Sequence, residues 1–137
     1  QPWFFKVYKG KSKDVLCEII QKIDKEKYSA VKINKFIDKV KSSDTVISVC
    51  MNRDESNRVP EWEEIAAVSM AVQNMWLSCY VNSIGSYWST PALKDDYAKQ
   101  SGLNSNQKSL GFFFMGSYKH VETPKAREGL DSKVEWV

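Results

Sequence analysis

The residues best suited to chemistry lie from Ile84 to Pro91 and read Ile-Gly-Ser-Tyr-Trp-Ser-Thr-Pro, directly after a long stretch without a helix breaker. Gly85 has no Cβ, so the backbone there can approach a flat ring closely, and the N–H groups that follow can donate to the edge of that ring. A helix C-cap glycine followed by an aromatic packing residue would give the same pattern, and is commoner. The segment therefore indicates either a ring-binding turn or a plain helix end.

Side chains that catalyse reactions by themselves are scarce. His120 is the only histidine, so the sequence offers neither a His-rich zinc site nor a nucleophile and base pair. The three cysteines, Cys17, Cys50 and Cys79, are widely separated within apolar patterns, which predicts reduced, packed thiols. We therefore expect no catalytic side chain and no metal, with any chemistry supplied by a bound cofactor.

Positive charge is concentrated near the start of the chain. The net charge is +3, but the segment 6–41 holds 11 lysines against 5 acids. This excess would favour a phosphate-bearing ligand, whereas lysines along amphipathic helices more often form a solvated face. The aromatic residues do not alternate with the lysines as in a stacking platform, so nucleic-acid binding is not expected.

The length and composition fit one globular domain spanning residues 1–137, with 42% hydrophobic and 12% aromatic residues. The sequence has no apolar run of the roughly 20 residues that a membrane span needs, and no secretory segment, so we expect a cytoplasmic protein without membrane contact. The chain starts at Gln1 without an initiator Met and leads at once into a strand-like run, which suggests a domain incomplete at its N-terminus.

Alternating helical and extended patterns predict an α+β domain of two or three layers. The expected strands are Trp3–Tyr8, Thr45–Met51 and Lys108–Gly116, with a short extended segment after Ile84. Four helices are expected: one that starts after the N-cap Ser12, one over Val31–Val40, one over Glu61–Ser83 and one from Pro91 to near Gly102. The tail is expected to be irregular until Val134–Val137, which could pair or pack.

The helix expected over 61–83 is apolar on nearly every side. Such a helix must be buried on all sides, which a chain of this size can hardly achieve alone, so a second subunit is expected to cover it. The amides of Gln73 and Asn74 interrupt this pattern and are expected either to bind neighbouring backbone or to lie at the seam between subunits.

Taken in order, four segments resemble the nitroreductase family: Val59–Glu64, Ala71–Leu77, Ile84–Pro91 and Leu110–Gly116. Gln1–Phe4 is similar to the end of a family segment in which Gln-Pro-Trp follows a flavin-contacting loop. The resemblance implies a nitroreductase-like α+β fold, with a central, mostly antiparallel sheet flanked by helices, and a homodimer. The family's Arg-rich initial segment, which wraps the FMN phosphate, has no counterpart here.

The resemblance also implies an FMN-dependent enzyme that transfers hydride from NAD(P)H to nitroaromatic, quinone or similar acceptors. The alternative is a flavin carrier or interaction module of the same fold without redox turnover. The implied cofactor-binding residues are Gln1, Ile84, Gly85, Ser86, Trp88, Ser89, Lys125 and Arg127. Lys125 and Arg127 would hold the phosphate or else form a solvated basic pair, and Gln1 would donate to the flavin ring.

Overall fold

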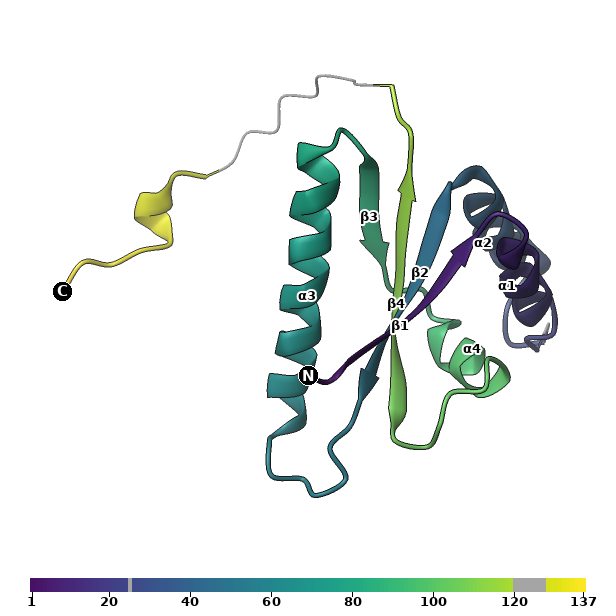
Figure 1. Cartoon of the computed structure of the whole chain (residues 1–137), viewed down its shortest axis with the longest axis horizontal. Coiled ribbons are helices and arrows are strands. Elements are labelled where there is room, and N and C mark those ends of the chain that lie inside the picture. Colours follow the sequence, from purple (N-terminus) through teal and green to yellow (C-terminus); the bar gives the residue numbers. More distant parts are fainter. Residues whose placement is uncertain (25, 120–127) are drawn as a thin grey trace.

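The computed structural model describes residues 1–24, 26–119 and 128–137. Within these residues four strands form one antiparallel sheet in the order β1-β2-β4-β3 (Figure 1). The strands are β1 (Trp3–Lys9), β2 (Thr45–Asn52), β3 (Gly85–Ser89) and β4 (Gln107–Gly116). The predicted α+β fold with an antiparallel sheet flanked by helices is confirmed.

The helices make this a three-layer arrangement. The helices α1 (Ser12–Gln21), α2 (Ala30–Ser42) and α4 (Lys94–Gln100) pack on one face of the sheet, and α3 (Glu61–Val81) packs on the other (Figure 1). Because side chains alternate between the two faces of a strand, neighbouring residues of β4 belong to different cores. Phe112 and Phe114 join the cluster under α1, α2 and α4, whereas Phe113 joins the cluster under α3.

The central strands are buried as their apolar sequences predict. Every residue from Val46 to Met51 is buried, because β2 lies between two strands and both sheet faces are covered. Cys17, Cys50 and Cys79 are free and buried, in agreement with the prediction of packed thiols. None of the helices in the described residues is long and apolar enough to cross a membrane.

Three details differ from the sequence predictions. α4 begins at Lys94 rather than Pro91, because a turn in which the Lys94 amide donates to the Pro91 carbonyl comes first. Ser12 is the first residue of α1 rather than its cap, although its hydroxyl accepts from the Lys9 amide at 2.7 Å. Val134–Val137 form no strand and Trp136 is 93% exposed, so this end neither pairs nor packs.

Candidate functional site

Ile84–Ser89 forms the turn and short strand that the sequence predicts. After α3 the chain turns through Ser83, which has a φ of 54°, and the Ile84 amide donates to the Cys79 carbonyl at 2.8 Å. β3 follows at the edge of the sheet and pairs only with β4. One side of its backbone therefore has no strand partner in the described chain, and its N–H groups on that side are available to a ligand.

The side chains of β3 divide between the two faces of the sheet. Tyr87 faces the α2 side, where it stacks on Phe114 with ring centroids 5.0 Å apart. Trp88 packs into the cluster under α3, and its indole N–H donates to the Leu110 carbonyl at 3.1 Å. The Trp88 side chain therefore packs within this chain, whereas Gly85 begins β3 and is not the helix C-cap of the alternative interpretation, because α3 ends at the C-cap Asn82.

The backbone at Gly85 borders a concavity of about 310 Å³ between the end of α2 and the end of β4, lined also by Ser42, Ser86 and Gly116. A Cβ added at Gly85 would lie 2.9 Å from Cδ1 of Tyr118 and 3.1 Å from the Gly116 carbonyl oxygen. Glycine therefore lets the Tyr118 side chain and the end of β4 lie directly against this backbone.

Ser89 lines a second, smaller concavity of about 190 Å³, between α2 and the segment that joins β3 to α4. Lys32, Lys35 and Lys39 of α2 line the same space, and Nζ of Lys39 lies 5.9 Å from the ring centroid of Tyr87. In the sequence, these lysines recur along one predicted helix, and that spacing favours a solvated face. The three lysines are exposed, in agreement with that prediction, and the structure also places them beside Ser89, a predicted site residue.

Asp96 connects α4 to the loop before α2 at one end of this lysine-lined concavity. Its carboxylate pairs with Lys27 at 2.5 Å and accepts a hydrogen bond from the Tyr28 hydroxyl at 2.7 Å. Hydrogen bonds from Lys27 and then Tyr28 lower the pKa of Asp96 to about 2. Asp96 is therefore engaged by its own partners and forms no ion pair with Lys32, Lys35 or Lys39 in the described part of the chain.

Gln1 lies far from the other predicted residues. The Asn52 amide donates to the Pro2 carbonyl, which places Gln1 beyond the end of β2, whereas Gly85 pairs with Gly116 at the opposite end of the sheet. The eight residues of β2 span roughly 23 Å at about 3.3 Å per residue step. A single chain therefore does not bring Gln1 together with Ile84–Ser89, and Lys125 and Arg127 lie outside the described residues.

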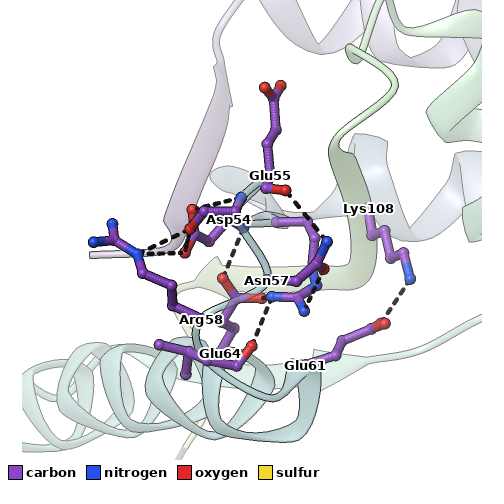
Figure 2. Close-up of polar contacts among 10 residues, drawn as sticks. Asp54, Glu55, Asn57, Arg58, Glu61, Glu64 and Lys108 are labelled. Carbon is purple, nitrogen blue, oxygen red and sulfur yellow. Dashed lines mark hydrogen bonds and ion pairs between the residues drawn. The ribbon is translucent and has the colours of Figure 1, made fainter.

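Gln1 is exposed and borders a concavity of about 520 Å³, whose wall is held together by a buried ion pair. Arg53 contacts the Glu64 carboxylate at 2.5 Å, with only 18% and 7% of the two side chains exposed. The other Glu64 oxygen accepts from the Asp54 amide at 2.8 Å (Figure 2). This pair fixes the loop after β2 onto the first turn of α3.

Replacing Glu64 with Gln is expected to lower the free energy of unfolding by about 3 kcal/mol, because the change leaves a largely buried guanidinium without its counter-charge. Urea unfolding measures the loss. The control is Glu61→Gln, which breaks the solvent-exposed Glu61–Lys108 pair on the same helix and should leave the midpoint nearly unchanged. Equal losses in the two variants would contradict a special role for the Arg53–Glu64 pair.

One face of α3 carries apolar side chains that nothing in the described chain covers. The most exposed are Trp62, Met70, Leu77, Tyr80 and Val81, with Tyr80 79% exposed. Gln73 and Asn74 are also exposed, so they do not bind neighbouring backbone in the interior. Exposed apolar surface of this extent is typical of an interaction site.

Comparison with known proteins identifies the family of this chain. The model of the nitroreductase family matches residues 1–117. The protein named "Putative NAD(P)H nitroreductase YdjA" of Escherichia coli strain K12 is 24% identical over 123 residues, which cover 85% of this chain and 66% of that protein. The chain thus spans about two thirds of the length of the curated relatives it matches.

Solved structures show the same fold. A nitroreductase-like family protein from Bacillus cereus has a TM-score of 0.85 at 25% identity and matches 99% of this chain and 73% of its own. The FMN and NADPH-dependent nitroreductase NfnB from Sphigopyxis sp. strain HMH has a TM-score of 0.67 at 13% identity, with 98% and 79% covered. With a family match over most of its length, the chain belongs to the nitroreductase family.

Proposed function

We propose that this chain forms the flavin-binding part of an FMN-dependent oxidoreductase that transfers hydride from NAD(P)H to nitroaromatic, quinone or similar acceptors. The observation that carries the proposal is the edge strand beginning at Gly85, which has no strand partner on one side in the described chain and borders a concavity, in a chain of this family. When bound, FMN would accept hydride from the nicotinamide and deliver it to the acceptor.

The residues around β3 fit both ends of such a cofactor. The free edge of β3 offers backbone N–H donors to the flat ring, and Gly85 lets the ring come close to them. The lysines of α2 beside Ser89 add positive charge, which suits the anionic parts of FMN. The protein's own contribution is therefore position, hydrogen-bond donors and charge, without a dedicated acid or base.

Replacing Lys39 with Met is expected to weaken FMN binding by about tenfold, equivalent to roughly 1.4 kcal/mol for one lost charged contact. Fluorescence titration of FMN at two salt concentrations measures the change, which should shrink at high salt. The matched control is Lys41→Met, which removes the same charge from the same helix but lies outside the lysine-lined concavity. Equal weakening by both variants would argue for a diffuse charge effect instead.

The site is proposed to be completed by a second copy of the chain. Gln1 and Gly85 lie at opposite ends of the sheet, so both can contact one flavin only if they come from different protomers. The exposed apolar face of α3 supports a homodimer, because a second copy would cover it. The contact between Gln1 and the flavin and the homodimer itself are both parts of this proposal.

The activity is tested by mixing the purified protein with FMN, menadione and either NADH or NADPH, and following nicotinamide absorbance. Oxidation that requires both FMN and the quinone supports the proposal, and the faster donor identifies the preferred nicotinamide. A protein that binds FMN yet oxidises neither nicotinamide with any quinone or nitroaromatic would favour a flavin carrier.

A further inference from the structure

A bulge in β4 lies beside the end of β3. Val49 of β2 pairs with Gly111 and the next residue, Cys50, pairs with Ser109, so Leu110 is an extra residue in β4. On the other side of β4, the pairing with β3 stops at Ser89, which lies opposite Phe112. Bulges often end strand pairing and redirect side chains next to functional sites.

Gly111 lets the end of β3 lie unusually close to this bulge. Its φ is +115°, a backbone conformation that residues with side chains rarely adopt. A Cβ at this position would lie 2.3 Å from the Ser89 carbonyl oxygen and 3.1 Å from Nε1 of Trp88. Any side chain at position 111 must therefore push the last two residues of β3 away.

Two hydrogen bonds hold the bulge and the end of β3 in this arrangement. The Trp88 indole N–H donates to the carbonyl of the extra residue, Leu110, at 3.1 Å. The Gly111 amide reaches the hydroxyl of the buried Ser109 at 3.4 Å. Ser89, the next residue after Trp88, lines the concavity that Lys35 and Lys39 also line.

We propose that Gly111 is a positioning residue for the flavin site. It touches no ligand itself, but its missing side chain determines where Trp88 and Ser89 lie, and so where the end of β3 meets the lysines of α2. This inference rests on the proposed FMN binding and deepens it. A shift of about 1 Å in such supporting residues is enough to cost a binding or catalytic site much of its performance.

The test compares Gly111→Ala with Gly10→Ala and Gly102→Ala in the whole protein. Both control glycines also have positive φ values, but a Cβ at either one meets no atom within 4 Å. All three variants place a side chain at a positive φ, although the φ of +115° at Gly111 lies outside the left-handed region of the two controls. Only Gly111→Ala also pushes on β3, which the Ser89 and Trp88 resonances report directly. NMR resonances of the Trp88 indole N–H and the Ser89 amide report the displacement, and FMN titration reports the consequence.

Gly111→Ala is expected to shift both resonances and to raise the Kd for FMN by about tenfold or more, whereas the controls stay near the unsubstituted protein. Unshifted resonances, or shifted resonances with unchanged FMN affinity, would overturn the inference. If the unsubstituted protein binds no FMN, the proposed function itself fails, and the resonances still show whether Gly111 places the end of β3.

A second variant keeps the inference testable if Gly111→Ala does not fold. Trp88→Phe retains an aromatic ring but removes the N–H that donates to Leu110. It should raise the Kd for FMN several-fold and shift the Ser89 amide resonance, whereas Trp136→Phe, on the exposed tail, should change neither. An unchanged Ser89 resonance and FMN affinity in Trp88→Phe would contradict the positioning role.

Discussion

Replacing Met70 and Leu77 together with Glu is expected to convert the protein from a dimer to a monomer and to abolish measurable FMN binding. The two side chains lie seven residues apart on α3 and are 63% and 54% exposed in the single chain. If a second copy covers them, each Glu would place an unpaired carboxylate in an apolar interface, where an uncompensated charge is strongly unfavourable. The flavin site would then lose the part that the second copy supplies.

Sedimentation velocity measures the mass, and FMN titration measures the accompanying loss of binding. The matched control replaces Val15 of α1 and Val134 of the C-terminal segment, two exposed valines away from both α3 and the α2 lysines, with Glu. It adds the same charge but should leave both the dimer and FMN affinity intact. A monomeric unsubstituted protein, or a dimeric Met70→Glu, Leu77→Glu variant, would contradict the dimer proposal.

Replacing Gly85 with Val is expected to weaken FMN binding by about a hundredfold or more, equivalent to roughly 2.8 kcal/mol, while the fold persists. The side chain would occupy the surface that a flat ring must approach. The φ of Gly85 is not positive and Val suits a strand, so the backbone tolerates the change. The new Cβ would lie 2.9 Å from Cδ1 of Tyr118 and 3.1 Å from the Gly116 carbonyl oxygen, so the end of β4 must shift by a few tenths of an ångström to admit it.

FMN titration and thermal unfolding of the same samples separate a blocked site from a damaged fold. Gly129→Val is the control, because Gly129 has open space around it and an extended conformation with φ of −61° and ψ of 160°. Its FMN affinity and melting temperature should match those of the unsubstituted protein. Normal FMN affinity in Gly85→Val would place the ring elsewhere and contradict the assignment of Ile84–Ser89.

Local patterns predicted the elements of this fold well, because a buried strand or helix face requires apolar residues at a regular spacing. The apolar run Thr45–Met51 predicted a central strand, and β2 is buried between two strands. The all-round apolar character of 61–83 predicted a helix that one chain cannot cover, and several of its apolar side chains are exposed. The interpretation of Pro91 as a helix start was wrong by three residues, because the turn before α4 depends on its tertiary setting.

Local sequence patterns could not predict how the residues of the candidate site are arranged in space. The opposed positions of Gln1 and Gly85 follow from strand order and register, which pair residues more than 20 positions apart. The bulge at Gly111 depends on the register between β2 and β4. The α2 lysines became part of the candidate site only because α2 packs beside the end of β3. Each of these features is tertiary, so one short segment of sequence cannot encode it.

FMN binding is tested most directly by the visible absorbance spectrum of the purified protein after incubation with FMN and removal of unbound cofactor. The proposed FMN binding predicts a yellow protein with a flavin spectrum, retained at about one FMN per chain and bleached by NADH or NADPH under anaerobic conditions. A colourless protein that retains no FMN would contradict it.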